Sequence, residues 1–177
     1  MVKANIMDEG ALRRAVTRIS YEIIERNKGA AKLCLLGIPR RGVLVAARIA
    51  DKLHELEGLR PPCGLLDPAP FRDDLAGREI PPDRTELPCS LDGMRVVLID
   101  DVIHTGRTVR AAIDAIMAKG RPELIQLAVL VDRGHRELPI KPDYVGKNLP
   151  TSRDERVAVT LTELDGEDGV SIVGGAE

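Results

Sequence analysis

Two adjacent carboxylates, Asp100 and Asp101, are followed after two apolar residues by the short polar loop HTGRT at 104–108. Such a loop offers free backbone amides, and Thr105 and Thr108 add hydroxyl donors, so that it can bind a phosphate. Carboxylates repel phosphate, and we therefore expect the acid pair to bind sugar hydroxyls or a magnesium ion. A phosphate-binding loop beside an acid pair predicts a ribose 5-phosphate ligand.

These residues must be positioned by a strand before them and a helix after them. The run VVLI at 96–99 is typical of a strand buried on both faces. Apolar residues from Val109 to Met117 then recur with helical spacing, and Gly120 follows where a left-handed residue usually ends a helix. The loop therefore precedes a helix N-terminus, which favours an anion, at the carboxyl end of a strand, where open α/β sheets bind ligands.

Two other nucleotide-binding motifs are absent from the sequence. No G-x-G-x-x-G follows a predicted strand, which excludes the dinucleotide fingerprint. Gly37 and Gly42 have the spacing of a P-loop, but Val43 and Leu44 stand where Lys and Ser or Thr are required.

The composition narrows the class of protein further. A length of 177 residues suits one domain, for which about 150 residues is usual. The formal net charge of −2 excludes a globally basic nucleic-acid binder but leaves room for a local basic patch. Three isolated cysteines, no signal peptide and no apolar run of about 18 residues predict a cytoplasmic protein without membrane association.

A helix is predicted from about Asp8 to Asn27, with Asp8 as its N-cap. One face carries an apolar stripe that includes Leu12, Val16, Ile19 and Ile23. The opposite face carries a row of polar side chains with helical spacing: Arg14, Thr17, Arg18 and Tyr21. This row is either an ordinary solvated face or a basic strip that meets phosphates, with Tyr21 available to stack on a base.

The run VVLIDDVIHTGRT at 96–108 resembles the phosphoribosyl-pyrophosphate (PRPP) motif of type I phosphoribosyltransferases. The resemblance implies their α/β fold, with a central, mostly parallel sheet flanked by helices and a small hood. The chain would then be a single phosphoribosyltransferase domain over 1–177, with the hood built from both chain ends.

The resemblance also assigns a role to the second predicted strand, LCLL at 33–36, and to the loop GIPRRG that follows it. In these transferases the corresponding loop holds pyrophosphate, which implies that role for Arg41 and Arg40. Pro39 and Arg40 stand where a threonine or lysine pair is usual in the family, and Pro39 lacks an N–H donor. A helix is predicted from Val43 to about Glu57.

The stretch from 59 to 91 is rich in proline and charge, unlike the rest of the chain. Phosphoribosyltransferases carry a mobile loop here that closes over PRPP and excludes water. The run FRDDL at 71–75 resembles the usual YRDDL motif of that loop, with Phe71 in place of Tyr. The resemblance implies a flexible loop over about 68–90, from which Arg72 reaches the leaving pyrophosphate.

Three further segments resemble the PyrR family, regulators of pyrimidine operons that are also uracil phosphoribosyltransferases. They are ALRRAVTRISYEIIERNKG in the first helix, VDRGHRELPI and DYVGKNLPTS. The resemblance implies a homodimer or tetramer whose basic surface binds a stem-loop in the pyr mRNA leader, promoted by the uridine nucleotides UMP and UTP. The implied RNA-binding residues are Arg14, Thr17, Arg18, Tyr21, Arg26, His135, Arg136, Lys141 and Lys147.

The implied reaction is uracil plus PRPP giving UMP plus pyrophosphate, with Mg²⁺ accompanying PRPP. Asp100 and Asp101, with Arg72, are the expected catalytic residues, and the acid pair is a candidate for the metal. Uracil is expected under the hood, near 131–133. The expected PRPP and UMP contacts are Arg40, Arg41, Asp100, Asp101, His104, Thr105, Gly106, Arg107 and Thr108.

Three hypotheses remain at this point. The first is a bifunctional RNA-binding regulator and enzyme. The second is an RNA-binding regulator that keeps the nucleotide site only as a sensor, which the changes at Pro39, Arg40 and Phe71 favour. The third is a phosphoribosyltransferase for another base with no RNA role, which the PyrR-like segments disfavour.

Overall fold

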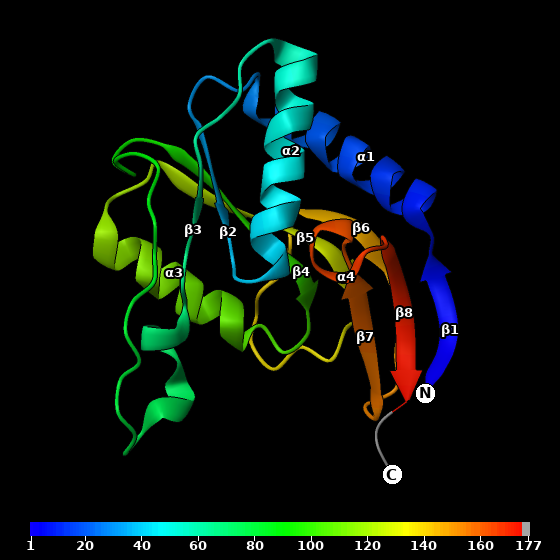
Figure 1. Ribbon diagram of the computed structural model, residues 1–177. Coiled ribbons are helices and arrows are strands. Elements are labelled where there is room, and N and C mark those ends of the chain that lie inside the picture. Colours follow the sequence, from blue (N-terminus) through cyan, green and yellow to red (C-terminus); the bar gives the residue numbers. More distant parts are fainter. Residues whose placement is uncertain (175–177) are drawn as a thin grey trace.

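The computed structural model describes residues 1–174, and the larger of its two sheets is entirely parallel. The sheet has five strands in the order β3-β2-β4-β5-β6 (Figure 1). The strands are β2 (Leu33–Gly37), β3 (Cys63–Leu65), β4 (Arg95–Ile103), β5 (Leu124–Asp132) and β6 (Tyr144–Asn148). The predicted α/β class is therefore confirmed.

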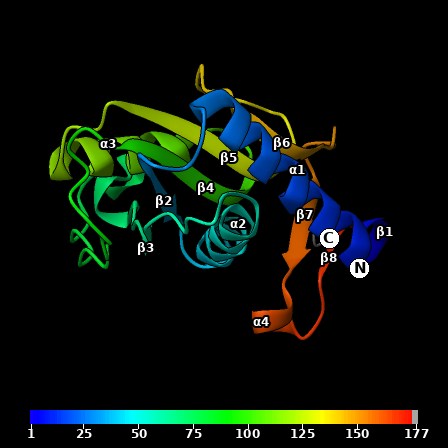
Figure 2. The same ribbon diagram turned by 90° about the horizontal axis from the view of Figure 1, so that it is seen from above.

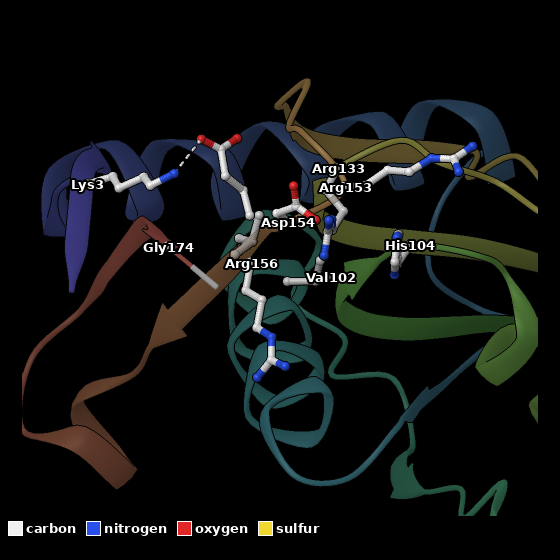
Figure 3. A pocket seen from close by; sticks show the side chains of 10 residues that line it. Lys3, Val102, His104, Arg133, Arg153, Asp154, Arg156 and Gly174 are labelled. Carbon is white, nitrogen blue, oxygen red and sulfur yellow. Dashed lines mark ion pairs between the residues drawn. The ribbon is translucent and has the colours of Figure 1, made fainter. Parts of the chain in front are cut away.

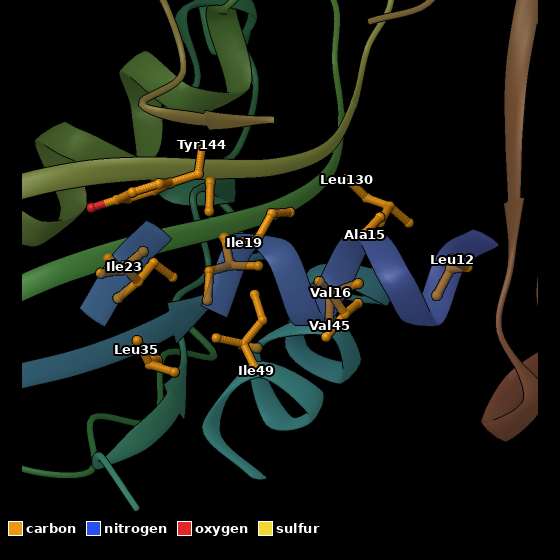
Figure 4. Packing of buried hydrophobic residues seen from close by; sticks show 14 of the residues in the cluster. Leu12, Ala15, Val16, Ile19, Ile23, Leu35, Val45, Ile49, Leu130 and Tyr144 are labelled. Carbon is orange, nitrogen blue, oxygen red and sulfur yellow. The ribbon is translucent and has the colours of Figure 1, made fainter. Parts of the chain in front are cut away.

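Helices cover both faces of this sheet. The two helices α1 (Glu9–Asn27) and α2 (Arg41–Glu57) lie on one face (Figure 2). They share one core with Leu35, Val97 and Ile99, and Figure 4 shows Leu35 in this core beside both helices. The helix α3 (Arg107–Lys119) packs on the other face, against Leu36 and Leu98. Neighbouring strand residues thus point to opposite cores, which is why these strands read as unbroken apolar runs.

The helix ends agree only in part with the local sequence signals. Asp8 caps α1 as predicted, since its Oδ1 accepts a hydrogen bond from the Ala11 amide at 2.7 Å. The helix α2 begins at Arg41, two residues before the predicted start at Val43. The left-handed conformation expected at Gly120 is wrong, because its φ is 173°. Close packing favours a glycine there instead, since a Cβ would lie 3.0 Å from the Leu91 Cβ and would require Leu91 to shift.

The predicted strand at 96–99 is also too short. The strand β4 continues to Ile103 because it pairs with β5 as far as Ile103 opposite Asp132. Asp100 and Asp101 therefore lie within the strand rather than after it.

A second, antiparallel sheet joins the two ends of the described chain (Figure 1). Its strands are β1 (Val2–Met7), β7 (Glu155–Thr160) and β8 (Gly169–Gly174), in the order β1-β8-β7, with the short helix α4 (Thr162–Asp165) between β7 and β8. The sheet packs through Val159 and Val170 onto the core formed by α1 and α2. Because β7 contacts β4 and faces Val102 across a cavity, the small sheet lies beside the carboxyl end of the large sheet.

The proline-rich segment before β4 contains two short 3₁₀ helices, η1 (Ala69–Phe71) and η2 (Asp73–Leu75). It lies along α3, where Arg110 donates to the Phe71 carbonyl at 2.7 Å and Lys119 pairs with Asp83. Within residues 1–174, no helix is both long and apolar enough to cross a membrane.

Candidate nucleotide site

The acid pair lies at the carboxyl end of β4, and its two side chains have different surroundings. Asp100 is buried, with 8% of its surface exposed, whereas Asp101 is partly exposed. Alternation along a strand explains this difference, because successive side chains point to opposite faces. Burial, and next the negative charge of Asp101, raise the pKa of the Asp100 carboxyl well above its usual value.

The loop after β4 is held mainly by its carbonyl groups, and in the described chain only the Arg107 amide donates within it, to the Thr105 Oγ1 at 3.2 Å. The His104 carbonyl accepts from Arg136 at 2.8 Å, and the Thr105 carbonyl accepts from the amides of Glu137 and Leu138 at 2.9 and 3.2 Å. Gly106, with φ 92°, is the N-cap of α3. Among the described residues, the amides of Thr105, Gly106 and Thr108 donate to no protein acceptor outside the helix. This arrangement suits an anion at the α3 N-terminus.

The loop from Gly37 to Gly42 is packed against the backbone of β4 at Ile99 and Asp100. The Ile38 amide donates to the Ile99 carbonyl at 2.9 Å, and a Cβ on Gly42 would lie 2.6 Å from the same oxygen. A Cβ on Gly37 would likewise lie 2.4 Å from the Val43 Cα. Close backbone packing, and not a P-loop, therefore explains the spacing of Gly37 and Gly42. The peptide bond between Pro39 and Arg40 is cis.

The three arginines predicted to meet pyrophosphate have different partners. Arg40 is exposed. Arg41, in the first turn of α2, donates from one terminal nitrogen to both carboxylate oxygens of Asp165 in α4, at 3.0 and 3.1 Å. Arg72 pairs with Asp74, two residues further along its own loop. Arg41 and Arg72 are thus each paired with an aspartate outside the acid pair, and Arg40 is exposed at the end of the 37–42 loop.

Arg107, a predicted phosphate contact, is directed toward two other segments. Its Nε donates to Glu137 at 2.7 Å, and its terminal nitrogen pairs with Asp73 of η2. The side chain therefore joins the phosphate loop to the proline-rich segment, while the backbone of Arg107 remains in the first turn of α3.

A cavity of about 990 Å³ separates the core from the small sheet (Figure 3). Val102, His104 and Arg133 line it from the core, and Lys3 and residues 153–157 line it from the small sheet. Burial, followed by the charges of Arg133 and His135, lowers the pKa of His104. Sequence reasoning missed Lys3, Arg153 and Arg156, which come together only because the small sheet joins β1 to β7 through β8 and places β7 against β4.

Most candidate RNA-binding residues gather along α1 and the edge strand β6. Arg18 donates to the Val145 carbonyl at 3.0 Å, and Arg26 pairs with Asp143 at 2.8 Å. Arg14, Tyr21, Lys141 and Lys147 are exposed, and Thr17 is partly exposed. Arg18 is thus hydrogen-bonded to the backbone of β6, and Arg26 is paired with a carboxylate next to that strand. The side chains of Arg14, Lys141 and Lys147 are exposed to solvent.

His135 and Arg136 are placed differently from the α1 residues. The His135 ring lies edge-on to His104 with centroids 6.0 Å apart, and its Nε2 is 2.6 Å from the Thr151 carbonyl oxygen. The Arg136 side chain, 22% exposed, is hydrogen-bonded within the protein. Both residues adjoin the phosphate loop rather than the exposed row on α1.

A parallel sheet with this acid pair and phosphate loop defines a phosphoribosyltransferase, and the comparisons agree. The family model described as a phosphoribosyl transferase domain matches residues 3–165. The hypoxanthine phosphoribosyltransferase of Trypanosoma cruzi has the same fold, with a TM-score of 0.76 and 16% identity over 99% of this chain and 98% of that one. A hypoxanthine-guanine phosphoribosyltransferase of Bacillus anthracis has a TM-score of 0.73, with 15% identity over 98% of this chain and 99% of that one.

Sequence relatives define the class more narrowly. The protein named Bifunctional protein PyrR in Pelotomaculum thermopropionicum is 58% identical, over 99% of this chain and 98% of the relative. The Pyrimidine operon regulatory protein of Lactococcus lactis is 56% identical, over 97% of this chain and 98% of the relative. The chain belongs to the PyrR family, as its sequence motifs predicted.

Proposed function

We propose that the chain regulates pyrimidine biosynthesis genes by binding their mRNA leader, and that it also converts uracil and PRPP to UMP and pyrophosphate. The observation that carries the proposal is the adjacency of the Asp100–Asp101 pair and the α3 N-terminus at one edge of the sheet. This adjacency suits a sugar phosphate. Relatives named as bifunctional and as operon regulators support the double role.

The proposed reaction forms a bond between uracil N1 and ribose C1 as the bond from C1 to pyrophosphate breaks, and the proton on N1 passes to the departing pyrophosphate or to water. Because the sugar gains oxocarbenium character, the protein contributes mainly positioning and charge stabilisation. The amides at 105–108 hold the 5-phosphate, and the acid pair orients the ribose hydroxyls. Arg40 and Arg41, with Arg72 on closure of the 68–90 loop, meet the leaving pyrophosphate.

Magnesium is the metal that this reaction class implies, and the acid pair fits it. The described residues contain no cluster of three His, Cys, Asp or Glu side chains that could bind a metal. Mg²⁺ is commonly held by one or two carboxylates together with substrate phosphates, so two acids suffice. Bound with PRPP, the ion would neutralise charge on the pyrophosphate.

The cavity between the core and the small sheet is the proposed site of the uracil ring. It adjoins Val102 and His104, so a base joined to a ribose at the acid pair would enter it. The buried Arg133 belongs to the same wall. The small sheet, formed by both chain ends, would then be the hood over the base.

For RNA, we propose a basic surface on a homodimer, built from α1 and β6. Its members would be Arg14, Thr17, Arg18, Tyr21, Arg26, Lys141 and Lys147. The other two candidates, His135 and Arg136, would border this surface beside the nucleotide site. Exposed cations would meet phosphates, and Tyr21 would stack on an unpaired base. UMP or UTP in the nucleotide site would promote the binding.

Pyrophosphate release tests the enzymatic half of the proposal. Wild-type protein with PRPP and Mg²⁺ should release pyrophosphate with uracil but not with hypoxanthine or orotate. Asp101→Asn should lower kcat/KM by about 100-fold, because ribose orientation is lost. Release with another base, or full activity of Asp101→Asn, would refute the assignment.

One observation favours a second candidate, a nucleotide-sensing regulator with negligible turnover. Arg41 is engaged by Asp165 rather than directed freely into the site. A gel shift with a pyr leader stem-loop distinguishes the candidates when combined with the uracil assay. UMP-dependent binding without pyrophosphate release would establish the sensor. Lys147→Ala should weaken RNA binding in either case, and unchanged affinity would reject the proposed surface.

A further inference from the structure

The Arg136 side chain lies where three segments of the chain meet. Its Nε donates to the Ile140 carbonyl at 2.8 Å, and one terminal nitrogen donates to the His104 carbonyl at 2.8 Å. The other terminal nitrogen pairs with Asp132 at 2.7 Å. All three nitrogens of the guanidinium are therefore engaged, and its rigid, planar fork fixes the geometry of the junction.

The backbone next to Arg136 also contacts the phosphate loop. The amides of Glu137 and Leu138 both donate to the Thr105 carbonyl. Gly106 is enclosed by the same segment, because a Cβ on it would lie 3.5 Å from the Arg136 Cδ and 3.6 Å from Ile140. A displacement of the phosphate loop would therefore move residues 136–140 with it.

The same segment continues directly into the proposed RNA surface. Lys141 is exposed immediately after Ile140. Asp143 then donates its amide to the Leu127 carbonyl and pairs through its carboxylate with Arg26 of α1. A short chain of contacts thus runs from the phosphate loop through Arg136 to Lys141 and Arg26.

We infer that Arg136 is a positioning residue that couples occupancy of the nucleotide site to the geometry of the RNA surface, and is not an RNA ligand itself. The inference rests on the proposed function. A nucleotide phosphate at the amides of 105–108 would stabilise the arrangement in which the carbonyls of this loop accept from Arg136, Glu137 and Leu138. The carbonyls of that loop would then hold Arg136 and the segment through Lys141 in one arrangement. RNA would then bind a segment that the nucleotide already holds in place, and the cost of fixing that segment would not fall on RNA binding. Nucleotide and RNA would therefore each raise the affinity for the other.

A direct role in RNA binding would require Arg136 to exchange these contacts for an RNA phosphate. Lys141 provides the contrast, because it is exposed and, among the described residues, has no hydrogen bond or ion pair through its side chain. A ligand residue and a coupling residue should therefore behave differently when UMP is added. A coupling residue changes the ratio of RNA affinities with and without UMP, whereas a ligand residue lowers both affinities equally.

The test compares Arg136→Lys with Lys141→Gln, using full-length protein and the hairpin RNA transcribed from upstream of the organism's pyrimidine genes. Arg136→Lys keeps the charge but cannot span three partners. RNA dissociation constants are measured with and without saturating UMP at several salt concentrations. UMP dissociation constants are measured by calorimetry, with and without RNA.

For Arg136→Lys, the gain in RNA affinity that UMP gives to the wild type should fall to about 1, from the ~5- to 150-fold usual for such coupling. The salt dependence of RNA binding should stay unchanged. Lys141→Gln should keep the full UMP effect, while its salt slope falls by about 0.7 to 0.9 because one phosphate contact is lost. In the wild type, RNA should raise UMP affinity by the same factor as UMP raises RNA affinity.

Two results would overturn the inference while leaving the proposed function intact. One is a full UMP effect in Arg136→Lys. The other is an equal loss of RNA affinity with and without UMP, accompanied by a reduced salt slope. Hydrogen exchange of wild-type protein gives a measurement independent of the variant: UMP should slow exchange at 137–143, and no change there contradicts the coupling. A wild type that binds no leader RNA would instead refute the proposed function, and the inference with it.

Discussion

Arg41 donates to both carboxylate oxygens of Asp165, at 3.0 and 3.1 Å, and thereby joins the first turn of α2 to α4 in the small sheet. The contact is incomplete for a guanidinium, because the Arg41 Nε is buried without a partner among the described residues. Asp165 thus binds the Arg41 side chain, which the proposed reaction requires at the pyrophosphate. The contact is one that a phosphate group could replace.

Asp165→Asn should strengthen the binding of PRPP and pyrophosphate. The aspartate competes with the pyrophosphate for Arg41. Removing one partly exposed ionic contact of about 1 kcal/mol would lower the KM for PRPP and the inhibition constant of pyrophosphate by about fivefold. Initial rates at varied PRPP, and pyrophosphate product inhibition, measure the effect. The KM for uracil should stay unchanged, which serves as an internal control. A higher KM for PRPP would mean that Asp165 orients Arg41 rather than competing for it.

Asp100→Asn should stabilise the protein without ligand at neutral pH. Burial and Asp101 raise the pKa of Asp100 in the folded state, so the folded protein loses stability as the pH rises from about 4 toward that raised pKa. The amide removes this cost, and each kcal/mol gained raises Tm by about 3 °C in a chain of this length. Thermal unfolding from pH 3.5 to 8 should show a higher Tm for Asp100→Asn than for the wild type, and this difference in Tm should disappear at the acidic end. A gain that is the same at every pH would rule out the electrostatic cause.

Arg48→Ala should destabilise the protein by about 2 kcal/mol at neutral pH, because it leaves the largely buried Asp168 without its partner. Arg48 forms hydrogen bonds of 2.6 to 2.9 Å with both Glu163 and Asp168. Arg48 is the main cause that lowers the pKa of Asp168 to about 2, so the pair stabilises above about pH 4 and loses its effect as the pH falls toward 2.

Urea unfolding at pH 7 and at pH 3 measures this difference. Lys52→Ala is the matched control, since Lys52 lies on the same helix and, within residues 1–174, pairs only with the exposed Glu55. Its substitution should cost less than about 0.5 kcal/mol. Equal costs for both variants would show that the Arg48 contacts do not stabilise the small sheet.

The parts of the site that lie close together in the chain could be predicted from the sequence. Asp100, Asp101 and the loop to Thr108 form one strand, turn and helix, so order and spacing specify them. The cap at Asp8 depended in the same way on a bond to a residue three positions away. The prediction extended to the family because whole segments matched it.

Contacts between distant segments could not be predicted. Arg41 and Asp165 are 124 residues apart, and nothing local to either residue indicates the pair. Arg136 appeared to be one more surface cation, and only the folded chain places His104 and Ile140 around its guanidinium. The length of β4 likewise depends on its pairing with β5 rather than on its own apolar run.

A crystal structure of the protein with UMP tests the central claim most directly. The account predicts the phosphate at the amides of 105–108, the ribose hydroxyls at Asp100 and Asp101, and the base in the cavity beside Arg133. A phosphate bound elsewhere, with the α3 N-terminus left to solvent, would contradict it.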